Sequence, residues 1–380
     1  MSLFLQQGGT VPLDGSASND VSGNDAMMSR SSLHADKKKF LSGLVIVFLI
    51  AATWVGSTQL GKETYTSHFN APYFTIWFST NWIMFSYLVC IPVYVLLYRK
   101  DLKSMWRHST LVFSAQGITL RSLATSTLPF TIIWEATNYM YLRALGSIPP
   151  TDVTALFSSA PAFVYILSFF ILREPLLVLR VFSVVLAISG ITLFAYSDGF
   201  GSASVIGVSL AVLSAVGAAT YKVCLKKRVG DADLIQMSLF LSLLGLFNFL
   251  AFWPIVATLH YTQVEQLNIH YIPWVPLCLS ALCSFAFNFF INFGIAFTFP
   301  LFISIGTILG IPMNAVIDVA IRHIDLLNWK ITAATLIIGG FLLMLTPSTD
   351  SLYLHKKFTM LIKLLPNKFS THNHHGELLK

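Results

Sequence analysis

Ten long apolar runs constrain the fold of this chain more than any other feature of its sequence. Of its 380 residues 55% are hydrophobic and only 11% are charged, whereas a soluble domain carries about 25% charged residues. Mean hydropathy is +0.70. Each run is about 20 residues or longer, which is enough for a helix to cross the hydrocarbon core. The sequence therefore predicts an all-α membrane protein with ten transmembrane helices.

The ten expected spans leave a tail at each end. In chain order they cover residues 40–61, 72–98, 124–145, 152–172, 177–197, 205–225, 234–259, 272–297, 300–321 and 327–345. Residues 1–36 are rich in Ser, Gly, Asn and Asp, which is typical of a disordered cytosolic tail. Residues 348–380 form a basic, partly amphipathic tail of the kind that lies on a membrane surface.

The basic residues predict the orientation of the spans. The net charge of +7 resides mainly in the tails and in every second loop, starting with the loop after the second span. Cytosolic loops carry such an excess of Lys and Arg, so both termini are expected in the cytosol. The protein itself is expected in the plasma membrane or an endomembrane. The charge thus reports topology, and no nucleic-acid partner is expected.

The chain also matches itself at a fixed distance. A shift of 150 residues relates the later spans of each half, and a shift of 161 relates the first and sixth spans. The matching pairs are Asn138 with Asn288, Pro150 with Pro300, Arg180 with Lys330, Gly190 with Gly340, and Val55-Gly56 with Val216-Gly217. Units of five spans must face opposite ways, so residues 37–198 and 199–347 are expected to be inverted repeats, as in many secondary transporters.

Several strings within residues 39–347 resemble one transporter family. They are WVGSTQLGK (54–62), NAPYFTIWFSTNW (70–82), TNYMYLRAL (137–145), TDVTALF (151–157), YSDGF (196–200), SVIGVSL (204–210), YKVCLK (221–226), SLLGLFN (242–248), NFGIAFTFP (292–300) and IPMNAVID (311–318). The chain is similar to the drug/metabolite transporter superfamily, and more closely to solute carrier family 35, subfamily F, in a group described as thiamine transporters. The resemblance implies a transport function with thiamine as the substrate.

Glu135 is the sharpest candidate for a substrate contact. It lies well inside an apolar span, where a carboxylate is costly and normally faces a cavity or a partner. The thiazolium of thiamine is a permanent cation that this carboxylate would neutralise. A structural glutamate, protonated or paired with Lys222, is the alternative.

Amides and aromatic rings complete the expected substrate site. Asn138 and Asn288 occupy equivalent repeat positions, where they would hydrogen-bond an aminopyrimidine; bonds between helices are the alternative. Aromatic side chains would form a wall for a cation or a flat ring, although each one alone fits lipid or core packing as well. The residues in question are Trp54, Trp82, Tyr139 and Tyr141.

Further polar residues lie near the span ends. Gln59 and Asn314 are assigned to substrate binding, and Asp318 and Lys222 to coupling or gating. Asn314 and Asp318 are four residues apart and share a helix face, although Asp318 also fits a hydrated outer boundary. Lys222 is expected to snorkel to the cytosolic headgroups rather than pair with an acid.

No catalytic pattern accompanies these residues. The sequence has no phosphate loop, no HExxH and no nucleophile elbow, so it predicts neither an enzyme nor a bound cofactor or metal. The four cysteines lie within apolar runs and fit packing roles. Asp152, which follows the double proline with one residue between, is expected to cap the fourth span.

The sequence thus favours a carrier that works by alternating access, with thiamine or a related small organic cation as its substrate. The bilayer and the substrate are its expected partners, and a homodimer is left open. A nucleobase, nucleoside or nucleotide-sugar carrier is the first rival, although a diphosphate would need two or more basic groups and only Lys222 lies within a span. A membrane scaffold or receptor that transports nothing is the second.

Overall fold

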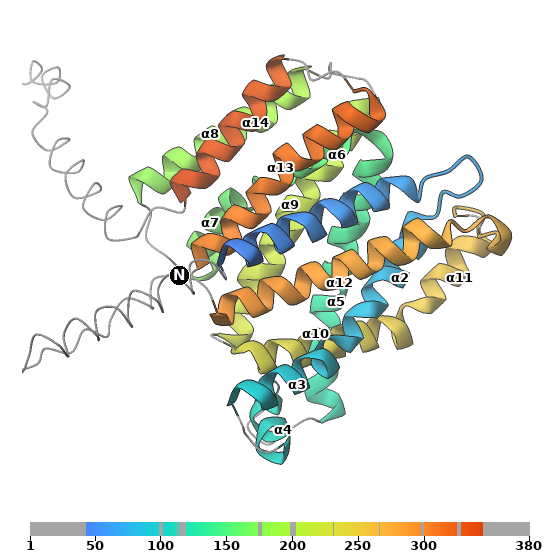
Figure 1. The fold of residues 1–380 in the computed structure, drawn as a ribbon, viewed down its shortest axis with the longest axis vertical. Coiled ribbons are helices and arrows are strands. Elements are labelled where there is room, and N and C mark those ends of the chain that lie inside the picture. Colours follow the sequence, from blue (N-terminus) through green and yellow to red (C-terminus); the bar gives the residue numbers. More distant parts are fainter. Residues whose placement is uncertain are drawn as a thin grey trace, which may run out of the picture.

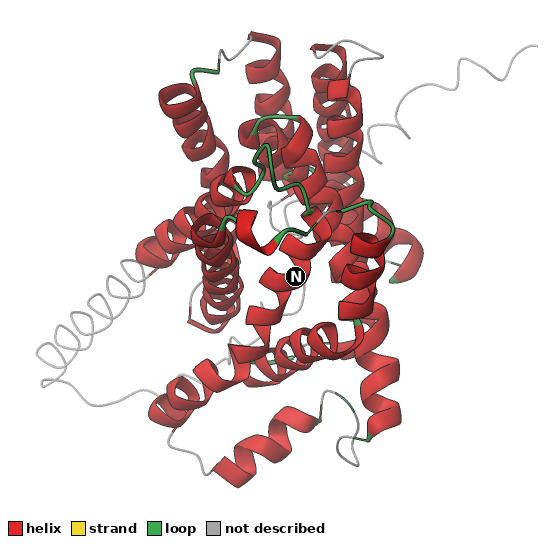
Figure 2. Cartoon of the chain, turned by 90° about the vertical axis from the view of Figure 1, so that its right-hand side faces the viewer, coloured by secondary structure: helices red, strands yellow, loops and turns green. Residues whose placement is uncertain are grey.

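The described part of the chain is helical apart from loops and an isolated bridge between Thr66 and Phe69 (Figure 2). The computed structural model describes residues 43–98, 102–111, 113, 119–173, 177–197, 203–230, 232–265, 267–297, 300–324 and 328–344. After a first helix, Gly43–Glu63, come α2 (Pro72–Trp82), η1 (Ile83–Phe85), α3 (Ser86–Tyr98), α4 (Leu102–Thr110), α5 (Leu120–Ser147), α6 (Pro150–Phe157), α7 (Ala160–Ile171), α8 (Val178–Ser197), α9 (Ala203–Val229), α10 (Leu234–Ala251), α11 (Trp253–Tyr261), η2 (Ile269–Tyr271), α12 (Trp274–Phe297), α13 (Pro300–Arg322) and α14 (Asn328–Met344). Both expected tails, 1–36 and 348–380, lie outside the described residues.

Six helical segments are long and apolar enough to cross a membrane, which confirms the all-helical membrane class. They are Gly43–Glu63, Pro72–Leu96, Pro150–Ile171, Val205–Val229, Leu234–Tyr261 and Trp274–Ile291. Val178–Leu193 and Asn328–Leu343 are apolar but shorter. Helices α5 and α13 cover the third and ninth expected spans. Helices therefore occupy each expected range, while the total of ten crossings stays a prediction.

The start of α6 corrects one expectation. The N-cap residue is Pro149, no side chain caps the helix, and Pro150 is its first residue. Proline suits this position because its fixed φ is already helical and its missing N–H would be unpaired there anyway. The prediction that Asp152 caps this helix is wrong: Asp152 lies in the first turn, and its Oδ2 is 2.5 Å from Lys330 Nζ of α14.

The helices form one bundle with α8 and α14 side by side at one edge and α3 and α4 at the other (Figure 1). One hydrophobic cluster, which includes Leu145, Leu156 and Ile337, joins α5, α6, α9, α13 and α14. A second, which includes Tyr87, Met105 and Phe240, joins α3, α4, α5, α9 and α10. The two clusters hold opposite edges of the bundle to α5 and α9, which lie between them.

A close contact with α10 covers the break between α2 and α3. The helix narrows to a 3-10 turn at η1, and the backbone N–H of Tyr87 donates to Ser242 Oγ at 2.7 Å. Gly245 makes the approach feasible, since a Cβ there would lie 2.5 Å from the backbone nitrogen of Met84. Asn248 Nδ2 donates to Asn81 Oδ1 at 2.9 Å one turn away.

These contacts are reciprocal under the shift of 161 residues. The shift takes Asn81 to Ser242 and Tyr87 to Asn248, so it converts the Asn81–Asn248 contact into the Tyr87–Ser242 contact. It also takes Met84 to Gly245, which already touch each other. A two-fold axis between two equivalent units would produce this exchange of partners.

The pair α8 and α14 shows the same exchange under the shift of 150 residues. A Cβ on Gly190 would meet Ile337 at 2.6 Å and the Ala333 carbonyl at 2.7 Å. A Cβ on Gly340 would meet the Ser183 carbonyl at 2.7 Å and the Ala187 nitrogen at 3.2 Å. The shift converts Gly190, Ser183 and Ala187 into Gly340, Ala333 and Ile337. Glycines allow backbones to approach closely, as is common where helices pack in membranes.

We predict that Gly340→Ala lowers the thermal stability of the protein. Its new Cβ would lie within 2.7 Å of a backbone carbonyl that cannot move aside, and such overpacking typically costs about 1–3 kcal/mol. Thermal unfolding of the detergent-purified protein, followed by size-exclusion fluorescence, measures the effect.

Gly339→Ala is the matched control. A Cβ on this neighbouring residue meets nothing within 4 Å, and alanine favours a helix over glycine by about 1 kcal/mol. The control should be neutral or slightly stabilising. Equal effects of the two substitutions would contradict the close contact between α8 and α14.

Candidate functional site

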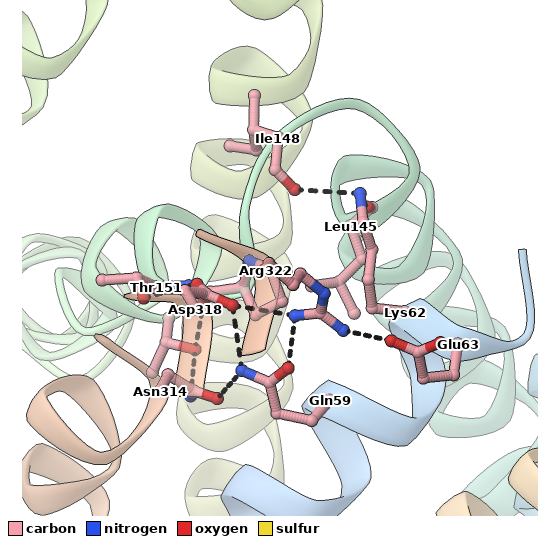
Figure 3. Close-up of polar contacts among 11 residues, drawn as sticks. Gln59, Lys62, Glu63, Leu145, Ile148, Thr151, Asn314, Asp318 and Arg322 are labelled. Atoms are coloured by element: carbon pink, nitrogen blue, oxygen red, sulfur yellow. Dashed lines mark hydrogen bonds and ion pairs between the residues drawn. The ribbon is translucent and has the colours of Figure 1, made fainter. Parts of the chain in front are cut away.

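Asp318 of α13 is the centre of a polar network at one end of the bundle (Figure 3). Its side chain is fully buried. Its Oδ2 accepts hydrogen bonds from Thr151 N at 2.8 Å and Thr151 Oγ1 at 2.5 Å. Its Oδ1 accepts from Gln59 Nε2 at 3.2 Å and from Arg322 Nη1 at 2.8 Å. The first helix, α6 and α13 are therefore joined by one carboxylate.

Gln59 and Asn314 extend this network inward. Gln59 Nε2 also donates to Asn314 Oδ1 at 3.0 Å, and Asn314 Nδ2 donates to Thr154 Oγ1 at 2.9 Å. Arg322 donates in addition to Gln59 Oε1. Three residues singled out in the sequence, Gln59, Asn314 and Asp318, are thus brought together. Their polar groups bind one another in this structure, which fits a closed end of the bundle.

A further ion pair of Arg322 and a second cation, Lys62, strengthen the same end. Arg322 Nη2 lies 2.6 Å from Glu63 Oε1, on the last turn of the first helix. Lys62 donates to the backbone carbonyls of Leu145 and Ile148, where α5 ends. We name the set Gln59, Glu63, Thr151, Asn314, Asp318 and Arg322 the polar latch. It holds the end of the first helix against the start of α6 and the end of α13.

One face of α13 reaches from this latch into the bundle. Every fourth residue faces the first helix, as expected for neighbours on one helix face. A Cβ on Gly306 would lie 3.0 Å from Ile50, and one on Gly310 would lie 2.8 Å from Trp54. Asn314, Asp318 and Arg322 then follow with their bonds to Gln59. We call this contact, in which Gly306 and Gly310 pack against the first helix, the seam. It continues on the same face of α13 directly into the polar latch.

Four aromatic rings gather beside this seam. The Trp54 ring centroid lies 4.7 Å from that of Phe287, 5.4 Å from Tyr141 and 5.5 Å from Phe157. All four side chains are half-buried. Tyr141 Oη lies 3.0 Å from Thr58 Oγ1, one residue from Gln59 of the latch. This aromatic cluster combines the first helix, α5, α6 and α12 and offers ring faces to a cation or a flat ligand.

Glu135 faces α2 rather than the aromatic cluster. Its side chain is 3% exposed, and among the described residues neither carboxyl oxygen has a hydrogen-bond partner. Thr80 and Tyr73 of α2 lie near it, and the buried Tyr73 hydroxyl also lacks a partner within the described part. Six residues separate Glu135 from Tyr141, which places them about 120° apart around α5.

The remaining candidates are dispersed. Tyr139 contacts Tyr73, with ring centroids 6.1 Å apart, and so belongs with Glu135. Asn138 and Asn288 make the same bond at equivalent positions: each donates to the carbonyl four residues earlier, at 2.8 and 2.9 Å. Lys222 is exposed and has no ion pair among the described residues. The candidates therefore divide between the latch, the aromatic cluster, the group around Glu135 and other positions, and do not form one site.

Sequence reasoning missed several members of these groups. Phe157 and Phe287 could not be told apart from the other phenylalanines of apolar spans. Tyr73 and Thr80 lie in the string NAPYFTIWFSTNW, but only tertiary packing points them toward Glu135. Arg322 was not among the candidates, although its position four residues after Asp318 is a signal for an ion pair on one helix face.

Glu265, in the loop after α11, fixes the start of α2. Its oxygens accept the backbone N–H of Tyr73 at 3.0 Å and that of Phe74 at 3.4 Å. A carboxylate is well placed there because the first N–H groups of a helix lack internal partners. Burial nevertheless raises the pKa of Glu265, against the opposing effect of these two N–H groups. The loop residue Glu265 therefore stabilises the start of α2, the helix that carries Tyr73 and Thr80.

We predict that Asp318→Asn destabilises the protein far more than Glu63→Gln. Both substitutions remove one carboxylate from Arg322, but the Asp318 side chain is 1% exposed and that of Glu63 is 60% exposed. Breaking a buried pair typically costs about 3–5 kcal/mol, and an exposed pair contributes about 1 kcal/mol or less. Thermal unfolding of both variants measures the difference, and similar small losses would show that the latch does not hold the helices.

The comparison with known proteins identifies the family. Residues 41–196 match the EamA-like transporter family. The chain is 39% identical to mouse (Mus musculus) solute carrier family 35 member F3 over 85% of this chain and 77% of that protein. It is 40% identical to mouse member F4 over 81% of this chain and 64% of that protein. Saccharomyces cerevisiae THI74, a thiamine-repressible mitochondrial transport protein, is 21% identical over 83% of this chain and 94% of its own length.

These relatives are transporters, and the matches extend over most of the spans described above. The all-helical bundle and its long apolar helices agree with them. The chain therefore belongs to solute carrier family 35 and is a multi-pass membrane transporter of the EamA-like kind.

Proposed function

We propose that this transporter is a secondary-active carrier that works by alternating access and moves thiamine or a related small organic cation. The observation that carries the proposal is Glu135, a buried carboxyl with no hydrogen-bond partner among the described residues. An unpaired carboxylate at membrane depth is costly. A bound cation supplies the missing counter-charge, and a nearby hydroxyl, that of Tyr73, is also open to a ligand.

Two further features support a flat cationic substrate. The aromatic cluster around Trp54 offers ring faces, which attract cations by about 0.5–2 kcal/mol each, depending on desolvation. The distant relative THI74 carries thiamine in its name, as a regulator of its expression. A carboxylate and aromatic ring faces together suit the thiazolium and the aminopyrimidine rings of thiamine. Glu135 and the cluster lie on different faces of α5, so α5 is the helix that lines the substrate path.

The two halves, 37–198 and 199–347, act in this proposal as inverted repeats. The reciprocal contacts of α2–α3 with α10 and of α8 with α14 support this relation. With both termini in the cytosol, as the basic residues favour, the polar latch lies at the outer or lumenal end. The conformation described here is then closed at that end, and alternating access requires the latch to open.

A nucleotide-sugar substrate is the rival proposal, and the basic residues near the latch disfavour it. A diphosphate needs cationic groups that are open to it. Arg322 is bound to Asp318 and Glu63, Lys330 to Asp152, and Lys62 to two carbonyls. A thermal-shift screen of thiamine, nucleosides and nucleotide sugars on the purified protein separates the two proposals, since a ligand that binds the folded state raises its stability.

We predict that Glu135→Gln weakens thiamine binding at least tenfold, equivalent to about 1.4 kcal/mol. The substitution keeps the shape and removes the charge, and the loss of one partner of a desolvated charge pair typically costs about 2–5 kcal/mol. Thermal stability should change little, because the carboxyl has no hydrogen-bond partner to lose among the described residues. Binding of radiolabelled thiamine and thermal unfolding are measured on the same preparation.

Asp233→Asn serves as the control, because it removes an equal charge from an exposed carboxylate at the start of α10, outside the latch and the aromatic cluster, and Asn still suits a helix N-cap. It should leave the affinity for thiamine unchanged. If Glu135→Gln instead lowers stability and the folded fraction keeps its affinity, then Glu135 holds helices together and the cation proposal is wrong.

A further inference from the structure

Helix α4 exposes two parallel rows of side chains that the transport site does not use. Leu102 and Trp106 are 56% and 50% exposed and lie four residues apart. Lys103 and Arg107, also four apart, are exposed directly beside them. Residues at this spacing are neighbours on a helix surface. An apolar row and a basic row therefore run next to each other along one face of α4.

The opposite face docks α4 firmly on the bundle. Met105 is 3% exposed and packs in the cluster that contains Tyr87 and Phe240. Ser109 Oγ lies 3.0 Å from Tyr87 Oη of α3. His108 Nε2 lies 2.6 Å from Asp233 Oδ2, the N-cap of α10. Helix α4 is thus a fixed part of the fold, and its exposed face is a built surface rather than the side of a loose loop.

A second short helix, α11, differs from α4 in the charge that accompanies its exposed apolar side chains. Helix α11 also exposes large apolar side chains, with Trp253 at 55% and Tyr261 at 82%. Its sequence, WPIVATLHY, contains no Lys or Arg. By contrast, α4 carries two, and the sequence just before it adds Arg99 and Lys100 against one acid, Asp101. Both helices present apolar groups to their surroundings, but only α4 of the pair adds positive charge.

We propose that the exposed face of α4 binds the surface of a bilayer that contains anionic phospholipid. The basic row of Lys103 and Arg107 pairs with the headgroup phosphates and carboxylates. Leu102 and Trp106 lie at the boundary between headgroups and acyl chains, where Trp is enriched in membrane proteins. This arrangement of an apolar face beside Lys and Arg is that of interfacial amphipathic helices. Figure 1 places α4 at the edge of the bundle beside α3.

Headgroup binding at α4 acts on two spans at once. The helix is tied to α3 through Ser109 and Tyr87 and to the start of α10 through His108 and Asp233. Lipid that binds the docked helix therefore stabilises the folded state of this edge. The proposal concerns the membrane that surrounds the carrier, so it does not depend on the identity of the substrate.

The test uses the full-length protein in nanodiscs of phosphatidylcholine, with or without a minor fraction of phosphatidylserine. Thermal unfolding and native mass spectrometry of retained phosphatidylserine are the readouts. Phosphatidylserine should raise the unfolding midpoint of the unmodified protein. The double variant Lys103→Gln/Arg107→Gln should lose this rise and bind phosphatidylserine roughly thirtyfold more weakly, since each basic residue adds about 1 kcal/mol near an anionic surface.

Arg121→Gln/Lys227→Gln is the matched control. It removes one arginine and one lysine, both exposed, from other helices. The control should keep the rise with phosphatidylserine. An equal loss in both double variants would mean that diffuse surface charge is responsible, and the proposal would be wrong. An equal rise with inorganic phosphate in phosphatidylcholine nanodiscs would also overturn it, because it would assign the effect to a free anion.

Discussion

The lack of water in a bilayer is the constraint on which this structure depends. Each backbone N–H and C=O in hydrocarbon must find a partner within the protein, so spans are helices and breaks are tolerated only where something covers them. The turn Ile83–Phe85 is such a break. The Tyr87 N–H beside it is taken up by Ser242 Oγ, and Gly245 lets the backbone of α10 approach. Polar residues in the spans therefore bind backbone groups, and small residues let neighbouring backbones approach. Both kinds of residue have these structural roles as well as being candidates for function.

Three of the four buried carboxylates in the described residues lie within the helices, and they differ in how well they are paired. Asp318 accepts four hydrogen bonds from three side chains and a backbone N–H. Asp152 binds Lys330. Glu135 has no hydrogen-bond partner among the described residues. Good pairing offsets the desolvation cost of a buried charge and suits a structural role. The unpaired Glu135 is the carboxylate with capacity left for a ligand, which is why the proposed function rests on it rather than on Asp318.

Sequence reasoning predicted the elements of this fold better than the groups its side chains form. Apolar runs located the helices because lipid imposes a simple rule on length and composition. Gln59, Asn314 and Asp318 could each be named as polar residues in apolar spans, but the sequence holds no measure of the contact between the first helix and α13. The capping role of Asp152 was wrong because the double proline starts α6 by itself and Lys330, far along the chain, binds the carboxylate. Glu135 could be named from the sequence as an acid within an apolar span, whereas its orientation toward α2 depends on packing.

The seam between the first helix and α13 links ligand binding to the latch in the proposed mechanism. The first helix and α13 pack closely where Gly310 meets Trp54, since a Cβ on Gly310 would lie 2.8 Å from the indole. A ligand that turns Trp54 toward α13 must therefore displace that helix. Asn314 and Asp318 follow on the same face, so a displacement of α13 separates them from Gln59, which bonds to both. Packed helices switch between discrete arrangements rather than deform continuously. In the proposed mechanism, occupancy of the aromatic cluster and closure of the latch are therefore opposed through α13.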